Sequence, residues 1–229
     1  SNERLLQTTF ERLNYCMPKE NIISKTNTKH VGNVRKQLTE LTENPMIMGE
    51  PVAKNTAPAI VLATKYIIQK SASDPIILAV PSVLLIKDNE KFVSTIKKGE
   101  KLAQEGYIVT FGIKPDYPET GYGYIDTAEK IGDGFKVKKF VEKPNFETAK
   151  EYLKQNTFYW NSGIFMFKAS TILNETVKHA TEIAKVSEEF DFSESNQIPF
   201  INFDKMPNIS IDYAVMEKSD NIALVKLES

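Results

Sequence analysis

A Glu-Lys-Pro triplet, Glu142 to Pro144, ends a segment typical of a β-strand, and its two charged side chains could bind a sugar phosphate. A carboxylate accepts hydrogen bonds from sugar hydroxyls, and an ammonium group neutralises a phosphate. The simpler alternative is a solvated ion pair before a turn, because Pro144 prevents the strand from continuing. Asn161 precedes another apolar segment and could either cap a turn or reach a hydroxyl.

A second polar cluster precedes an apolar helical pattern and contains Glu50, Lys54, Asn55 and Thr56. Asn or Thr at the start of a helix is ordinary N-cap chemistry and requires no ligand. Alternatively, the helix N-terminus and Lys54 bind an anion while Asn55 binds the polar edge of a ligand. Both interpretations can hold at once.

Three other residues give weaker indications of a site. Gly121 and Gly123 flank Tyr122 and fit a plain turn, although glycines also let a ligand approach the backbone amides closely. Asp212 falls in the first turn of an expected helix, where a carboxylate is favourable to the helix dipole without having any function.

Composition and charge exclude several classes of protein. Cys16 is the only cysteine, and the two histidines, His30 and His179, lie far apart, so we expect neither disulfides nor a Cys/His zinc site. A net charge of −1 gives no electrostatic footprint for nucleic acid or an anionic membrane. The longest apolar run, 75–86, is shorter than the roughly 18 residues that a membrane span needs. We therefore expect a cytoplasmic protein with neither of these partners.

Strands and helices alternate through the first half of the chain. Helical patterns over 5–13, 31–43, 60–68 and 89–105 separate expected strands at 21–24, 46–48, 76–80 and 107–112. This alternation predicts an α/β fold with right-handed crossovers and a Rossmann-like, mixed but mostly parallel sheet flanked by helices. The apolar segment 76–80 is expected to be a buried strand.

After Gly112 the pattern changes to an antiparallel excursion, in which 121–125 and 135–143 flank two glycines. A helix over 146–155, a strand over 162–168 and a helix over 169–186 come next. We expect the polar stretch 187–197 to be a surface loop, and 211–218 and 222–227 to form a short helix and a last strand. Both ends of the chain suggest a truncated domain.

Five motifs occur in an order that resembles the bacterial mannose-1-phosphate guanylyltransferases, also called GDP-mannose pyrophosphorylases. They are EPVAKNTAPAIVLA from residue 50, ETGYGYI from 119, VKKFVEKPNFETAKEYL from 137, FYWNSGIFMFKASTIL from 158 and SIDYAVMEKSDNIALV from 210. The resemblance implies one nucleotide-diphospho-sugar transferase domain over 1–229, with 1–112 on the nucleotide side and 113–229 on the sugar side.

The resemblance also implies a reaction. GTP and mannose 1-phosphate would give GDP-mannose and pyrophosphate with Mg²⁺, by in-line attack of the sugar phosphate on the α-phosphorus. Catalysis would then consist chiefly of positioning and charge neutralisation. We consider a homodimer as the assembly and polysaccharide biosynthesis as the use of the product.

The same resemblance assigns roles on the sugar side of the site. Glu142 and Asn161 would bind mannose hydroxyls, Gly121 and Gly123 would lie against the sugar, with a backbone contact from Gly123, and Lys143 would face the sugar phosphate as the catalytic residue.

On the nucleotide side, Glu50, Asn55 and Thr56 would line the nucleotide. Lys54 stands where the family has an arginine, so the charge is kept and the bidentate geometry is lost.

The chain departs from the family where metal and phosphate would bind. The family's Gly-rich opening loop does not precede Ser1, and Val83 stands where the family has a metal-binding Asp, so the metal ligands are unknown. The chain also ends before the segment that carries a second metal-binding Asp. Three alternatives are open: part of a longer enzyme, a non-catalytic homologue that binds sugar nucleotides, or a pyrophosphorylase for another sugar 1-phosphate.

Overall fold

The structure is a computed structural model that describes residues 2–84, 86–192 and 203–228. Its helices are α1 (Asn2–Asn14), α2 (Val31–Leu38), α3 (Thr56–Ser71), α4 (Asn89–Gln104), α5 (Phe146–Lys154), α6 (Ala169–His179), α7 (Thr181–Ser187) and a π-helix, η4 (Asp212–Met216). Its strands are β1 (Ile23–Asn27), β2 (Met46–Glu50), β3 (Ile76–Ala79), β4 (Ile108–Ile113), β5 (Gly123–Ile131), β6 (Gly134–Glu142), β7 (Phe158–Lys168) and β8 (Ile222–Lys226). Each helix among these residues is too short or too polar to span a bilayer.

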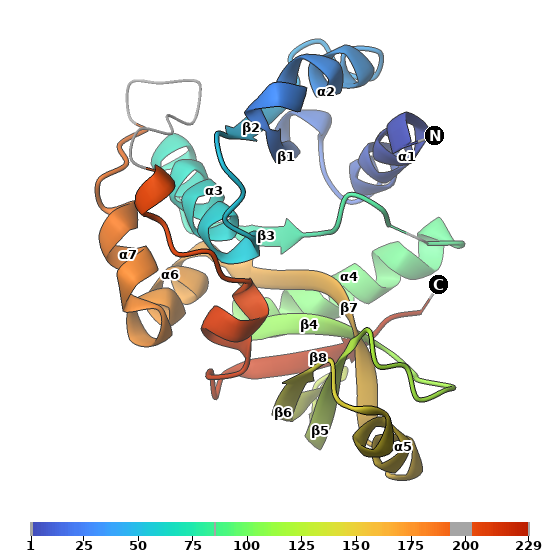
Figure 1. Cartoon of the computed structure of the whole chain (residues 1–229). Coiled ribbons are helices and arrows are strands. Elements are labelled where there is room, and N and C mark those ends of the chain that lie inside the picture. Colours follow the sequence, from blue (N-terminus) through green and yellow to red (C-terminus); the bar gives the residue numbers. More distant parts are fainter. Residues whose placement is uncertain (1, 85, 193–202, 229) are drawn as a thin grey trace.

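The strands form two sheets, and helices surround both, which confirms the expected mixed α/β fold (Figure 1). The first sheet is the parallel pair β1–β2. The second has the order β3-β7-β4-β8-β6-β5, and β7 also pairs with β5. Figure 1 shows β1, β2 and α2 grouped apart from the longer sheet.

The expectation of a mostly parallel sheet is wrong. In the longer sheet β4 and β8 pair in parallel, but β3–β7, β4–β7, β5–β6, β5–β7 and β6–β8 are antiparallel. The physical reason is the position of β7 between β3 and β4. These two strands run in the same direction, as the crossover through α4 requires, yet each pairs with β7 instead of with the other.

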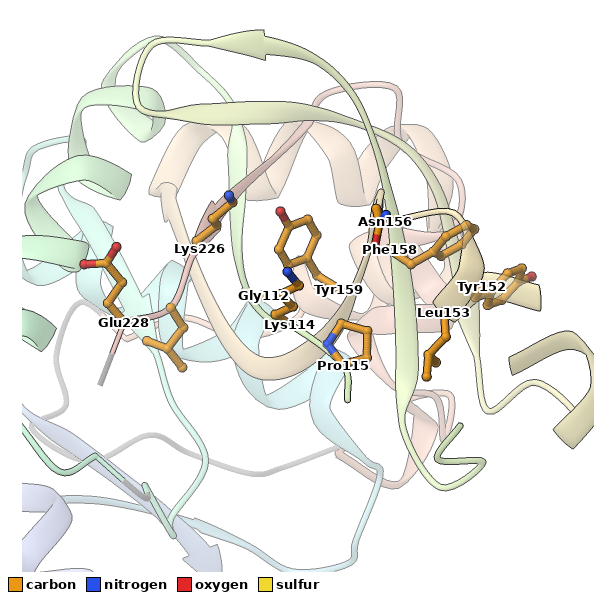
Figure 2. Close-up of a pocket in the computed structure, with 11 residues that line it drawn as sticks. Gly112, Lys114, Pro115, Tyr152, Leu153, Asn156, Phe158, Tyr159, Lys226 and Glu228 are labelled. Carbon is orange, nitrogen blue, oxygen red and sulfur yellow. The ribbon is translucent and has the colours of Figure 1, made fainter. Parts of the chain in front are cut away.

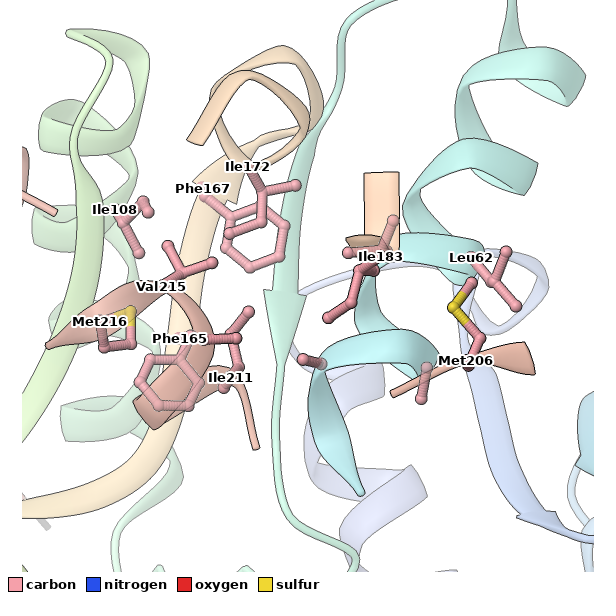
Figure 3. Close-up of a cluster of buried hydrophobic side chains, with 14 of the residues drawn as sticks. Leu62, Ile108, Phe165, Phe167, Ile172, Ile183, Met206, Ile211, Val215 and Met216 are labelled. Carbon is pink, nitrogen blue, oxygen red and sulfur yellow. The ribbon is translucent and has the colours of Figure 1, made fainter. Parts of the chain in front are cut away.

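Both faces of the longer sheet are buried, because side chains that alternate along its strands pack on opposite sides. One face carries residues such as Ile108, Phe165 and Leu224 and packs under α3, α6, α7 and η4. The other carries their sequence neighbours, such as Val109 and Met166, and packs under α4. Figure 3 shows Ile108, Phe165 and Phe167 gathered with residues of the covering helices. The core therefore lies on both sides of β4, β7 and β8.

Three local expectations need correction. The residues of β3 are partly exposed, because β3 is at the edge of the sheet and pairs on one side with β7. The helix expected over 169–186 is broken at Ala180, whose φ of −135° and ψ of 58° are not helical. The stretch 187–197 is not simply a surface loop, because Phe190 and Phe192 are buried in the core; residues 193–197 lie outside the described part.

Two helical glycines allow a direct test of the α4 packing. A Cβ at Gly99 would lie 2.6 Å from Cζ of the buried Phe111 ring, whereas nothing lies within 4 Å of a Cβ at Gly32 in α2. Gly99→Ala should lower the free energy of unfolding by about 1–3 kcal/mol, less a gain of up to about 1 kcal/mol from helix propensity.

Urea unfolding of both variants checks this prediction. The matched control, Gly32→Ala, should be neutral or slightly stabilising, since it gains helix propensity without a clash. Equal stability changes in the two variants would contradict the described packing of α4 on the sheet.

Candidate active site

A pocket of about 590 Å³ lies where segments far apart in the sequence meet. It is lined by Asn55, Glu142, Lys143, Asn208, Ile209, Ser210, Asp212 and Tyr213. Asn55 precedes α3, Glu142 ends β6, and η4 supplies Asp212 and Tyr213. Three of the residues expected from the sequence, namely Asn55, Glu142 and Lys143, therefore share one cavity.

The strand register brings Asn161 to the same place. Gly123 at the start of β5 pairs with Glu142 at the end of β6, and the next residue, Tyr124, pairs with Trp160 of β7. A Cβ at Gly123 would lie 2.6 Å from Oε2 of Glu142 and 3.4 Å from Cβ of Asn161. A side chain at this position would push the carboxylate of Glu142 out of the place it occupies beside Asn161.

Asp212 holds the side chain of Asn161. Nδ2 of Asn161 donates a hydrogen bond to Oδ1 of Asp212 at 3.1 Å, and Oδ1 of Asn161 accepts one from the backbone N–H of Gly163 at 3.0 Å. Sequence reasoning gave Asp212 no function, because its place in a first helical turn explained it sufficiently. Its position in the same motif order as Glu142 and Asn161 was the signal that could have revealed it.

Two residues of the pocket have backbones that favour glycine. Lys143 has a φ of 47°, and its N–H donates to the carbonyl oxygen of Tyr122 at 3.2 Å. Asn55 has a φ of 66° and a ψ of −163°, a combination adopted almost only by glycine. Such strain costs about 1–3 kcal/mol at each residue and persists only where the surrounding structure imposes it.

The start of α3 is tied to the segment before η4 by three hydrogen bonds. Oγ1 of Thr56 accepts from the N–H of Ile211 at 2.8 Å, the N–H of Ala57 donates to the carbonyl of Ile209 at 3.1 Å, and the N–H of Ile209 donates to the carbonyl of Lys54 at 3.2 Å. These bonds fix the expected nucleotide-side residues Lys54 and Thr56 beside the expected sugar side.

The amides that begin α3 are already used within the protein. Asn55 caps the helix, as expected, by accepting from the N–H of Thr56 at 2.9 Å, and Ala57 bonds to Ile209. The next residue, Pro58, has no N–H. An anion at this helix end would therefore have to depend on Lys54 and not on the first amides of the helix.

Glu50 is almost fully buried at the end of β2, with 3% of its surface exposed. Its Oε2 pairs with Nζ of Lys25 at 3.1 Å, whereas its Oε1 has no hydrogen-bond partner among the described residues. Burial raises the pKa of Glu50, and the charge of Lys25 opposes that rise. A buried acceptor without a donor suits a ligand that brings an N–H group.

Gly121 lies in an exposed loop, and its N–H is engaged within that loop. It donates to Oε1 of Glu119 at 2.8 Å. The neighbouring Tyr122 packs edge-on against Trp160, with ring centroids 5.2 Å apart. The amide of Gly121 is thus occupied within its own loop in this conformation.

The position at which the family has a metal-binding Asp offers no carboxylate. Val83 is 44% exposed and has no oxygen ligand in its side chain. Across 2–84, 86–192 and 203–228, no three His, Cys, Asp or Glu side chains form a group that could hold a metal ion. A magnesium ion here would depend on fewer carboxylates together with the phosphates of its substrate.

A second cavity, of about 290 Å³, lies at the carboxyl ends of the parallel pair β4 and β8 (Figure 2). Lys114 and Tyr159 line it, together with Lys226, whose Nζ lies 5.6 Å and 5.8 Å from the ring centroids of Phe135 and Tyr159. None of the residues expected from the sequence lines this cavity, so the candidate active site is the larger pocket.

Three carboxylates gather around the larger pocket. Burial raises the pKa of Glu142, and the charges of Asp212 and Glu217 raise it further, while Lys143 opposes them. Burial also raises the pKa of Asp212, and the hydrogen bond from Asn161 and the charge of Lys143 lower it. Like charges are thus held close together with one lysine, an arrangement typical of functional sites.

Comparisons with known proteins identify the family of the chain. A family model described as nucleotidyl transferase matches residues 1–205. A mannose-1-phosphate guanylyltransferase of Salmonella typhimurium is 39% identical over 98% of this chain and 48% of its own length. The chain spans about half the length of the curated relatives it matches.

Two crystal structures have the same fold. One, described as mannose-6-phosphate isomerase from Helicobacter pylori, is 30% identical with a TM-score of 0.84, over 98% of this chain and 88% of that one. Another, described as mannose-1-phosphate geranyltransferase from Thermus thermophilus, is 27% identical with a TM-score of 0.83, over 98% of this chain and 64% of that one.

The bond between Thr56 and Ile211 should contribute measurably to stability. Thr56→Val removes the acceptor and leaves the N–H of the buried Ile211 unpaired, so the free energy of unfolding should fall by about 1–2 kcal/mol. Thr56→Ser keeps the hydroxyl and should differ little from the wild type. Thermal unfolding compares the variants, and equal losses in both would contradict the role of the hydroxyl.

The raised pKa of Glu142 predicts a pH-dependent cost. The folded chain retains this proton better than the unfolded chain, so ionisation destabilises the fold as pH rises through the folded pKa. Glu142→Gln should therefore raise the free energy of unfolding at pH 7 by roughly 0.5 kcal/mol after allowance for solvent screening. The gain should vanish below about pH 4, where an unfolded glutamate is protonated. Denaturant unfolding from pH 4 to 8 measures it.

The control for this measurement is Glu100→Gln, at an exposed position of α4. It should show no such gain at pH 7. A stability difference for Glu142→Gln that does not change with pH would show that the charge is not its cause.

Proposed function

Because the chain belongs to the nucleotidyl transferase family, we propose that its full-length protein forms GDP-mannose and pyrophosphate from GTP and mannose 1-phosphate. The names of the curated relatives support this choice of substrates. The observation that carries the proposal is that Glu142 and Asn161 both lie beside Gly123. Lys143 follows Glu142 in the chain. This arrangement combines acceptors for hydroxyls with a cation for phosphate in one pocket.

On the sugar side, the proposal gives each group a task. The carboxylate of Glu142 and the amide of Asn161 bind sugar hydroxyls. The ammonium group of Lys143 faces the sugar phosphate, and its exposed side chain lines the pocket with Glu142. The backbone of Lys143 is fixed by its bond to Tyr122, so its side chain starts from a defined point at the edge of the pocket.

On the nucleotide side, Glu50 and Asn55 are proposed to contact GTP. Guanine presents an N–H donor edge, which is the complement of a buried carboxylate oxygen that has no donor. Thr56 acts through its bond to Ile211 and holds the two sides of the site together. The proposal divides the site into a nucleotide side, 1–112, and a sugar side, 113–229. Both sides belong to one domain, since β7 pairs with β3, β4 and β5.

The proposed step is a displacement at the α-phosphorus of GTP. An oxygen of the sugar phosphate forms a bond to that phosphorus, the bond to the bridging oxygen of the β-phosphate breaks, and pyrophosphate leaves with the electron pair. No covalent intermediate with the protein is needed, so Lys143 contributes by neutralising charge and by orientation.

Removal of the lysine charge tests the proposal. Full-length protein with GTP, mannose 1-phosphate and Mg²⁺ should release pyrophosphate, and Lys143→Met should reduce kcat/KM by about 100-fold, as for loss of one group that stabilises the transition state. Lys138→Met, at an exposed lysine of β6, the strand that precedes Lys143, is the control and should retain the wild-type rate.

Absence of pyrophosphate release from the wild type would overturn the proposed function. A wild-type rate in Lys143→Met would overturn the role of the lysine alone. Replacement of GTP by ATP, CTP or UTP tests the choice of nucleotide, and GTP should give the highest rate.

A further inference from the structure

We propose that Asp212 is a positioning residue for the sugar side of the site, because it fixes the orientation of the Asn161 amide. This inference rests on the proposed function for the identity of the ligand, a sugar 1-phosphate with free hydroxyls. It adds a residue of η4 to the site that the strands β5, β6 and β7 form.

The first observation is that each end of the Asn161 side-chain amide has one hydrogen-bond partner within the protein. An asparagine amide can rotate by half a turn, which exchanges its donor and its acceptor. Here Oδ1 is held by the N–H of Gly163 at 3.0 Å and Nδ2 by Oδ1 of Asp212 at 3.1 Å, so each end has a partner of the correct type. One N–H and one lone pair of the amide stay available for a ligand, and the two partners determine which end of the amide carries the donor and which the acceptor.

The second observation is that Asp212 is itself firmly placed. The N–H of Glu217 donates to the carbonyl oxygen of Asp212 at 2.9 Å, which closes the wide turn of η4. The preceding residue, Ile211, is 2% exposed, and its N–H bonds to Thr56. An anchored residue can impose its orientation on Asn161, whereas an exposed residue could not.

The third observation concerns charge. Asp212 interacts electrostatically with Lys143, Glu142, Glu217 and Tyr213. The charge of Asp212 therefore acts on both Glu142 and Lys143, in addition to its hydrogen bond to Asn161.

The test compares two substitutions at Asp212 by calorimetric titration of mannose 1-phosphate into the full-length protein and by steady-state kinetics. Asp212→Ala should raise Kd and KM for mannose 1-phosphate about tenfold and change kcat and the KM for GTP less than about threefold. Asp212→Asn keeps an oxygen acceptor for Asn161 and should recover most of the loss. Asp220→Ala, at an exposed position nearby, should match the wild type.

A double substitution separates positioning from a general structural effect. If Asp212 acts through Asn161, Asp212→Ala should weaken binding much less in the background of Asn161→Ala than in the wild type. Additive losses, or an equal rise in KM for both substrates, would overturn the inference. Unchanged affinity in Asp212→Ala would overturn it as well.

One readout is independent of the proposed function. In nuclear magnetic resonance spectra without ligand, the side-chain N–H resonances of Asn161 should lie away from those of an exposed asparagine, and Asp212→Ala should bring them close to the exposed values. Unchanged resonances would overturn the inference. Failure of the wild type to bind or convert mannose 1-phosphate would overturn the proposed function, while the resonances would still decide the role of Asp212.

Discussion

Strand β7 is the element on which the other parts of the structure depend, because it pairs with β3, β4 and β5. Its residues face α4 on one side and α3, α6 and η4 on the other, so both hydrophobic faces require it. The pairing with β4 shifts register between Thr110 and Gly112, and Gly112 is the residue that pairs with Asn161. Such an irregularity redirects side chains locally, and here it coincides with the candidate active site.

The site has a cost in stability that the rest of the fold must offset. Glu142, Asp212 and Glu217 repel one another, and burial disfavours their charged forms. Lys143 and Asn55 have backbone conformations that are unfavourable for their residue types. These features are destabilising in the free protein, which is consistent with a site organised before its ligand arrives.

The sequence predicted local structure well where the signal is local. The cap at Asn55 and the end of α4 at Gly106, which has a φ of 97°, arise from the preferences of single residues. The position of β7 between β3 and β4 could not be predicted in this way, since strand order depends on contacts between segments that are distant in the sequence. The break at Ala180 and the burial of Phe192 also arise from tertiary packing, which periodicity does not encode.

The site was predictable to a similar extent. Glu142, Lys143 and Asn161 stand out by residue type, and the structure places them together. Asp212 does not stand out, because its part in the site depends on a side-chain bond across 51 residues. Gly121 illustrates the reverse case, since its type suggested a ligand contact but a neighbouring glutamate occupies its amide.

Because η4 is a wide π-helical turn, the number of residues in this segment matters for its geometry as much as their identity does. A π-helix of this kind contains one more residue than an α-helical turn would, in the manner of a single insertion. Loss of one residue between Asp212 and Glu217 would shorten this turn to α-helical geometry, so the hydrogen bond from the N–H of Glu217 to the carbonyl oxygen of Asp212 would have to be replaced. In evolution this segment should therefore accept exchanges of side chain more readily than changes in length.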